Sequence, residues 1–361
     1  MTPLHELVAL SLLPVSRLRT IVQQFKSGFT ASDLLSLHCA DRQRRHPKAD
    51  NADRVRARAH AALERGMRAG LVAVRWDEAE YPAPLLLTID PPLVLWVRGS
   101  VAALQRPSVA IVGARTGSPY ALAVAERLAG ELAVCGVVVV SGLARGVDAA
   151  AHRGAVNAPQ GVTVAVLGSG ADVLYPREHG DLAARIVEEG AIVSELAPGT
   201  PPCAPFFPQR NRIISGLSRA VVVIEAGEKS GSLITARCAL EQGREVLAVP
   251  GNVLNGRNKG GHALLRDGAR LVESAADIIE ELGFEPDPAA AGFSRNTACL
   301  PPVDDPLLAV LPSGEACDLD RISGLSGLPM PRLLARLLEL EMEGQVRRLQ
   351  GGQFVRVDRS C

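Results

Sequence analysis

Residues 108–142 read SVAIVGARTGSPYALAVAERLAGELAVCGVVVVSG, and this stretch decides the fold class. Two runs of β-branched and small apolar residues enclose a segment whose apolar residues recur at helical spacing. Both runs are apolar throughout, which is typical of strands that are buried on both faces of a parallel sheet. The stretch therefore predicts a strand, a crossover helix and a second, parallel strand.

Further apolar runs of the same character follow, each ending in glycine or a polar turn. They are GVTVAVLGSG at 161–170, AIVSEL at 191–196, RAVVVIEA at 219–226 and REVLAVPG at 244–251. Stretches between them, such as SLITARCALEQG at 232–243, are helical by period. This alternation predicts an α/β fold with a doubly wound, Rossmann-like parallel sheet that is covered by helices on both faces.

The remaining sequence predicts smaller domains on either side. Residues 1–72 show short helical periods and predict a helical, SAM-like domain before the Rossmann-like domain at 73–284. Residues 285–304, rich in proline and alanine, predict a linker. Residues 305–361 predict three short helices and a hairpin that turns at 350–352. This order is typical of a winged helix.

Charge is distributed unevenly, although 39 Lys and Arg balance 39 Asp and Glu. Residues 1–75 hold thirteen basic against six acidic side chains, whereas residues 301–361 hold seven against nine. Any nucleic-acid footprint must therefore be a focused patch. Residues 41–58 are polar and basic. They are interpreted first as a solvated surface and second as a phosphate-contacting one.

Several classes of protein are disfavoured by composition. The seven cysteines are scattered and form no C-x-x-C pair, which argues against a disulfide scaffold or a metal site. No apolar run reaches the roughly 18 residues that span a bilayer, and no basic start precedes the first apolar stretch. The sequence predicts a cytoplasmic protein with no membrane partner.

Candidate ligand contacts follow the predicted strands, because doubly wound sheets bind ligands beyond the carboxyl ends of their strands. Gly113 permits a tight turn, and Arg115 lies beside a helix start that Ser118 and Pro119 predict. The alternative for Gly113 is a turn without a ligand. Neither G-x-G-x-x-G nor G-x-x-x-x-G-K-[ST] occurs, so no dinucleotide cofactor or ATP turnover is predicted.

The second strand continues into SGLARGVDAAAH at 141–152. Ser141 and Gly142 form the predicted turn, and Arg145 follows it. Ser141 with Asp148 and His152 suggests a hydrolase, but there is no G-x-S-x-G elbow. An Asp–His pair four residues apart more often stabilises a helix. No catalytic residue is predicted.

Aromatic and basic residues come together in PGTPPCAPFFPQRNRIISGLS at 198–218. Phe207 precedes Arg210, Asn211 and Arg212. Aromatic faces beside guanidinium groups suit single-stranded DNA, since bases stack and phosphates pair. The alternative is that a phenylalanine fills the core while the arginines pair with acids such as Glu225.

The next turn, within EAGEKSGSLITA at 225–236, opens a helix with small residues. Ser230, Gly231 and Ser232 are candidates for facing an anion at this helix start.

Taken in order, these motifs resemble the DprA/Smf family from about residue 76 to residue 282, with flanking domains in family order. The motifs are GAR at 113–115, SGLARGVDAAAH at 141–152, FPQRNRIISGLS at 207–218, EAGEKSGSLITA at 225–236, VPG at 249–251 and LLRDGA at 264–269. The resemblance implies a homodimer that binds and protects incoming single-stranded DNA and helps to load the RecA recombinase in natural transformation. By matched position it implies DNA contacts from Arg115, Phe207, Arg210, Asn211 and Arg212.

Two departures limit the resemblance. Relatives commonly carry a Cys-Asn or Cys-His pair where Gly261 and His262 stand, so this turn is given no binding role. The winged-helix-like region is acidic, which favours a protein-contact or structural element over a module that lies along phosphates.

The competing hypothesis is a nucleotide-processing enzyme that resembles the phosphoribohydrolases on a related fold. Their usual turn is P-G-G-x-G-T-x-x-E, but here the comparable EAGEKSGSLITA has no carboxylate at that place, so hydrolysis lacks its acid–base residue. A third hypothesis is a structural adaptor with a vestigial pocket.

Overall fold

The computed structural model describes residues 2–13, 18–46, 48–284, 305–311, 315–342, 345–349 and 352–356. The predicted linker at 285–304 lies outside the described residues, as do residues 350 and 351 of the predicted hairpin turn.

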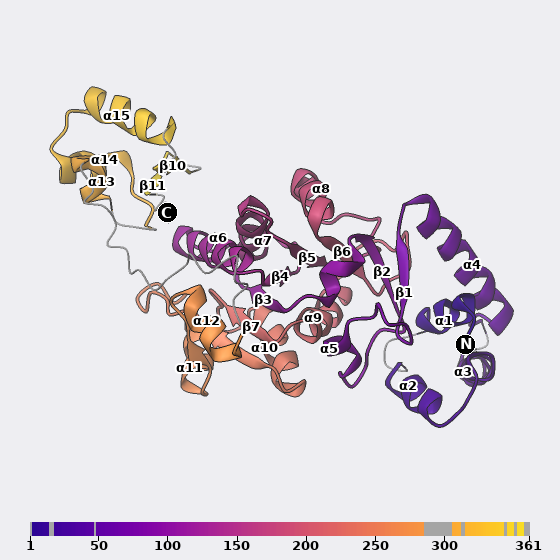
Figure 1. The fold of residues 1–361 in the computed structure, drawn as a ribbon. Coiled ribbons are helices and arrows are strands. Elements are labelled where there is room, and N and C mark those ends of the chain that lie inside the picture. The colour runs from indigo at the N-terminus through magenta and orange to yellow at the C-terminus, as the bar shows by residue number, and fades with distance from the viewer. Residues whose placement is uncertain are drawn as a thin grey trace.

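A nine-stranded sheet forms the centre of the chain, in the order β1-β2-β6-β5-β4-β3-β7-β8-β9 (Figure 1). Its strands are β1 (Val72–Arg75), β2 (Val94–Gly99), β3 (Ser108–Val112), β4 (Val138–Ser141), β5 (Thr163–Val166), β6 (Ala191–Ser194), β7 (Ala220–Val223), β8 (Glu245–Ala248) and β9 (Arg270–Leu271). Strands β3 to β9 run parallel to one another, whereas β2 pairs antiparallel with both β1 and β6.

Helices cover both faces of the sheet, because alternate residues of each buried strand point to opposite sides. Val109 and Ile111 of β3 pack beneath one helical layer, and Ala110 and Val112 beneath the other. The first layer contains α6 (Pro119–Val134), α7 (Val147–Asn157), α8 (Gly180–Glu189) and α12 (Ala275–Leu282). The second contains α5 (Ala83–Leu86), η2 (Val101–Gln105), α9 (Phe206–Leu217), α10 (Ser232–Glu241) and α11 (Lys259–Arg266). The predicted doubly wound α/β fold is confirmed.

The amino-terminal helices pack against the β1–β2 edge of the sheet (Figure 1). They are α1 (Leu4–Ser11), α2 (Leu18–Lys26), α3 (Ala31–Arg45) and α4 (Ala52–Arg68). Trp96 of β2 is fully buried in this contact. A side chain at Gly66 of α4 would place Cβ 2.6 Å from the Trp96 ring, so glycine allows the close approach of helix and strand.

The carboxyl-terminal region has the predicted winged-helix order. It comprises α13 (Pro306–Val310), α14 (Leu319–Ser326), α15 (Met330–Met342), β10 (Val346–Arg348) and β11 (Phe354–Arg356), the two strands being antiparallel. Leu333 and Leu337 of α15 form its small core with Phe354. None of the helices in the described part of the chain has both the length and the apolar character that a bilayer crossing requires.

Candidate nucleic-acid interface

The candidate site lies along the carboxyl edge of the parallel strands. The chain winds outward in both directions from β3, which has β4 on one side and β7 on the other. The gap between the loops after β3 and β7 is therefore the topological switch point, where such sheets bind ligands. We call the surface formed by the loops after β3, β4, β5 and β7 and by the start of α9 the crevice, because doubly wound sheets hold their ligands at this place. Most of the predicted site residues lie on these segments; Ser141 is the last residue of β4, Ser232 is the first of α10, and Arg212 lies in the middle of α9.

Arg115, Phe207 and Tyr175 form a cluster at the crevice. The guanidinium carbon of Arg115 lies 5.4 Å from the centre of the Phe207 ring. The Tyr175 ring lies 5.6 Å from the same ring, at 47°. Arg115 is exposed, Tyr175 is 40% exposed and Phe207 is half-buried. The cluster therefore offers solvent an aromatic surface beside a cation.

Local structure fixes the orientation of this cluster. The Phe207 ring lies against the backbone of Gly168, where an added Cβ would come within 3.0 Å of the ring. Tyr175 belongs to the loop that follows β5 and was not among the predicted residues. Its sequence signal was an aromatic side chain in a loop after a predicted strand, in a chain with only 3% aromatic residues.

Arg145 lies at the rim of the crevice and forms an ion pair with Glu178. Its Nε and Nη2 atoms donate to the two carboxylate oxygens of Glu178 at 2.6 and 2.7 Å. Hydrogen bonds to Glu178 raise the pKa of Arg145. Both side chains are more than half exposed, so a ligand could reach the pair from solvent.

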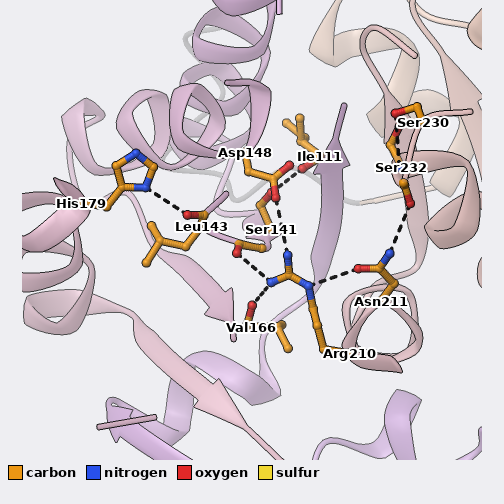
Figure 2. Close-up of polar contacts among 12 residues, drawn as sticks. Ile111, Ser141, Leu143, Asp148, Val166, His179, Arg210, Asn211, Ser230 and Ser232 are labelled. Carbon is orange, nitrogen blue, oxygen red and sulfur yellow. Dashed lines mark hydrogen bonds and ion pairs between the residues drawn. The ribbon is translucent and has the colours of Figure 1, made fainter. Parts of the chain in front are cut away.

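Arg210 points into the protein rather than into the crevice (Figure 2). Its Nη1 donates to the backbone carbonyls of Gly142, at 2.7 Å, and Val166. Its Nη2 lies 4.0 Å from Oδ2 of Asp148, and Nε donates to Oδ1 of Asn211 at 3.1 Å. Burial lowers the pKa of Arg210 to about 10, which still leaves a cation at neutral pH. Arg210 therefore joins the carboxyl ends of β4 and β5.

Asn211 and Arg212 are also buried. The Asn211 amide donates to the carbonyl of Gly231 at 3.2 Å (Figure 2). Arg212 pairs with Glu195, with 2.5 Å between Nη2 and Oε2, and its Nε lies 3.3 Å from Oδ2 of Asp90. Arg210, Asn211 and Arg212 therefore do not point into the crevice as their predicted DNA contacts would require. Each is buried and directed at groups of the chain itself: Arg210 at carbonyls and Asp148, Asn211 at Gly231, and Arg212 at Glu195 and Asp90.

The amino terminus of α6 is occupied by a carboxylate of the chain itself. Glu225, in the loop after β7, accepts from the Ser118 amide at 3.0 Å and from the Ser118 hydroxyl at 2.6 Å. Ser118 is the cap of α6 and Pro119 its first residue, as predicted. Because Glu225 fills the position at which a doubly wound sheet would hold a dinucleotide phosphate, this helix start offers no anion site.

The loop between β4 and α7 closes tightly on the loop after β3. Gly113 faces Val147, where an added Cβ would come within 2.8 Å. Gly146 has a φ of 77°, and a Cβ there would lie 2.3 Å from the carbonyl oxygen of Ala114. Asp148 in α7 is buried, which raises its pKa, while the Arg210 charge and hydrogen bonds from the amides of Ala144 and Gly142 oppose the rise. These two amides therefore donate to a carboxylate of the chain itself, as the Ser118 amide does to Glu225.

Ser141, Asp148 and His152 do not form a nucleophile–base arrangement. The Ser141 hydroxyl is fully buried and donates to the carbonyl of Ile111 at 2.6 Å (Figure 2). His152 contacts Thr163 rather than Asp148, with 2.7 Å between Nδ1 and Oγ1. The hydrolase interpretation requires a hydroxyl, a base and an orienting acid in series, which this geometry does not provide.

The turn before α10 borders the crevice beside α9. The hydroxyl oxygens of Ser230 and Ser232 lie 2.7 Å apart, and Ser232 is buried. Gly231 and Lys229 are exposed. Of the predicted trio, Ser230 and Gly231 are therefore the members that a ligand can reach. No group of three or more His, Cys, Asp or Glu side chains in the described ranges could hold a metal ion.

Comparison with known proteins decides the family. The profile of the family DNA recombination-mediator protein A matches residues 72–283, more than half of the chain, and the DprA winged helix domain matches residues 286–352. The chain belongs to the DNA recombination-mediator protein A family. The DprA/Smf resemblance is thus confirmed.

Relatives of this family are similar over much of their length. The chain is 43% identical to protein Smf of Escherichia coli over 293 residues, which is 79% of this chain and 77% of Smf. DNA processing protein DprA of Streptococcus pneumoniae is 43% identical over 208 residues, 56% of this chain and 72% of that protein. The solved structure of S. pneumoniae DprA covers 79% of this chain and 100% of its own, with a TM-score of 0.67 and 32% identity.

A second solved structure concerns the single-stranded DNA binding mode of DNA processing protein A from Helicobacter pylori. It covers 59% of this chain and 95% of its own, with a TM-score of 0.53 and 30% identity.

Proposed function

We propose that this chain binds single-stranded DNA in the crevice. The observation that carries the proposal is the exposed guanidinium of Arg115 over the Phe207 ring, with Tyr175 beside it. Such a surface suits an unpaired strand, because bases stack on aromatic faces while a neighbouring cation holds the phosphate. The H. pylori relative, whose structure is described for its single-stranded DNA binding mode, supports the same class of ligand.

The residues divide into contacting and positioning groups. Arg115, Phe207 and Tyr175 contact the DNA, with Arg145 and Lys229 at the rim. Arg210 and Asn211 are positioning residues, since they join the loops after β4, β5 and β7.

A mediator role follows from this proposal and from the family. The protein, as a homodimer, protects incoming single strands during natural transformation and helps RecA to assemble on them. We expect the protein to shorten the lag before RecA hydrolyses ATP on DNA that is already coated with a single-strand binding protein. A lag that does not change would contradict the mediator role while leaving the DNA binding untouched.

Titration of labelled oligonucleotides tests the binding proposal directly. We expect an unpaired strand to bind more tightly than a duplex of equal length, because a duplex hides its base faces from Phe207 and Tyr175. Fluorescence anisotropy at two salt concentrations measures both affinities. Equal affinity for the two ligands would contradict the proposal.

Arg115→Ala should weaken oligo-dT binding and reduce its dependence on salt. Loss of one phosphate contact on a single strand lowers the slope of log K against log salt by about 0.7. The measurement is a series of titrations across salt concentrations. Arg106→Ala is the matched control, since Arg106 is an exposed arginine just before β3, at the opposite edge of the sheet. A slope that Arg115→Ala leaves intact would remove Arg115 from the site.

Phe207→Ala should weaken binding by about 1–3 kcal/mol through loss of base stacking. The salt slope should stay the same, because no phosphate contact is lost. Phe207→Trp restores an aromatic face and is expected to recover much of the affinity. The same titrations compare the three proteins. A Phe207→Ala protein that binds as tightly as the wild type would show that the ring only packs against Gly168.

A further inference from the structure

Helix α4 carries a row of arginines that the proposed crevice does not use. At about 100° per residue, Arg54, Arg58, Arg65 and Arg68 fall within an arc of about 80° on one side of this helix. All four are exposed. The row extends from the first turn of the helix to its last, about 21 Å at 1.5 Å per residue. We call these four side chains the α4 row.

Contacts show where the α4 row points. Nε of Arg65 lies 2.7 Å from Oδ2 of Asp172, in the loop that follows β5. The other oxygen of Asp172 accepts from the Gly199 amide at 2.7 Å, and a Cβ on Gly199 would lie 2.7 Å from the Arg65 guanidinium. The loop that holds Asp172 also carries Tyr175. Arg65 therefore places the α4 row beside the loop after β5, which flanks the crevice.

Much of this charge is not neutralised. Arg54 and Arg68 form no ion pair among the described residues. Arg58 pairs with Asp50 but is 56% exposed, and Arg65 is 53% exposed. Asp53 pairs instead with Arg56, which lies off the row. The two acids of α4, Asp53 and Glu64, lie beside the arc of the row and not within it, whereas an ordinary solvated helix face would interleave acids with these bases.

The corner between α3 and α4 extends the positive surface. Arg44 at the end of α3 and Lys48 just after it are exposed and have no ion pair in the described part of the chain. They lie in the basic segment at 41–58, which the proposed crevice leaves unexplained.

We infer that the α4 row is a second phosphate-contacting segment for the same single strand that enters the crevice. The inference rests on the proposed function and extends it: the crevice stacks bases, and α4 holds the backbone of nucleotides that continue past Tyr175. Guanidinium groups in a row along a helix are suited to successive phosphates, whatever the bases. Binding should therefore strengthen with strand length beyond what the crevice alone can hold.

The test uses the full chain with Arg54→Ala and Arg68→Ala combined. Neither side chain has a carboxylate partner within the described ranges, and alanine favours a helix, so the fold should be kept. The matched control combines Arg106→Ala with Arg219→Ala, which removes equal charge from exposed positions before β3 and β7, at the opposite edge of the sheet. Each protein is titrated with a short strand, dT6, chosen to fill the crevice, and with a longer strand, dT30. Circular dichroism verifies folding.

We expect the α4 variant to bind dT6 within about twofold of the wild type. For dT30, its affinity should fall about tenfold and its salt slope by about 1.4, two contacts at about 0.7 each. The control should bind both strands as the wild type does. An equal loss on both lengths, an equal loss in the control, or no loss on dT30 would each overturn the inference. Failure of the wild type to bind either strand would instead overturn the proposed function, and the inference with it.

Discussion

Replacing Arg210 with alanine is expected to lower the free energy of unfolding by about 3–5 kcal/mol. The guanidinium is the cation nearest to the buried carboxylate of Asp148, with 4.0 Å between the charged atoms. It is also a donor to the carbonyls of Gly142 and Val166. Truncation would leave the buried Asp148 carboxylate with its amide donors but without its cation, and two carbonyls without this donor, and each loss costs free energy.

Chemical denaturation followed by circular dichroism measures this effect. Arg115→Ala is the control, because an exposed side chain should change stability by no more than about 0.5 kcal/mol. The double variant Arg210→Ala with Asp148→Ala should lose less than the sum of the two single variants, since it removes the buried charge together with its partner. An Arg210→Ala protein with wild-type stability but no DNA binding would show that Arg210 contacts DNA directly.

The parallel part of the fold was predictable because its signal is local. Each of the strands β3 to β8 is a short apolar run, and helical periods between these runs identify the crossovers. Strands β1 and β2 were not predicted, although Val94, Leu95 and Trp96 are apolar and buried. They pair antiparallel and lack a long crossover helix, so the strand–helix alternation on which the prediction depended is absent there.

The orientation of the site arginines could not be taken from their spacing alone. Helix α9 begins at Phe206, so Arg210 and Arg212 point about 200° apart around its axis. Helical geometry therefore indicates that the two arginines cannot both face the crevice, but it does not say which of them does. Which arginine points where depends on Asp148 and Glu195, whose partnership with α9 arises only in the folded chain. The same holds for Glu225 on Ser118, which are 107 residues apart.

His152 is expected to make the protein lose stability as the solution becomes acidic. The Thr163 hydroxyl donates to the carbonyl of Val139 at 2.5 Å, so Nδ1 of His152 must be the donor in its contact with Thr163. Nε2 is then an unprotonated nitrogen, and among the described residues it has no hydrogen-bond partner. Burial chiefly, with the charges of Arg210 and His179, lowers the pKa of His152 from 6.5 to about 3. A second proton on this ring would create a buried positive charge and an Nε2 donor that has no acceptor among the described residues.

The direction of the effect follows from where each state takes up its proton. The unfolded chain protonates His152 near its ordinary pKa of 6.5, whereas the folded protein does so near a pKa of 3. Between these values the unfolded state binds more protons, so acid favours unfolding. The contribution of His152 is complete above pH 6.5 and declines as the pH falls toward 3. At about 1.4 kcal/mol per pH unit, the loss between pH 6.5 and pH 5 is about 2 kcal/mol.

His152→Leu separates this effect from the other acid-sensitive groups. Leucine cannot titrate, and Thr163 keeps its bond to Val139, so no buried donor loses its acceptor. Urea unfolding at pH 7 and pH 5 gives the stability change of each protein across that interval. The wild type should lose about 2 kcal/mol more than the variant. Equal losses in the two proteins would show that His152 does not resist protonation in the folded state, and that its buried Nε2 finds an acceptor when the ring becomes charged.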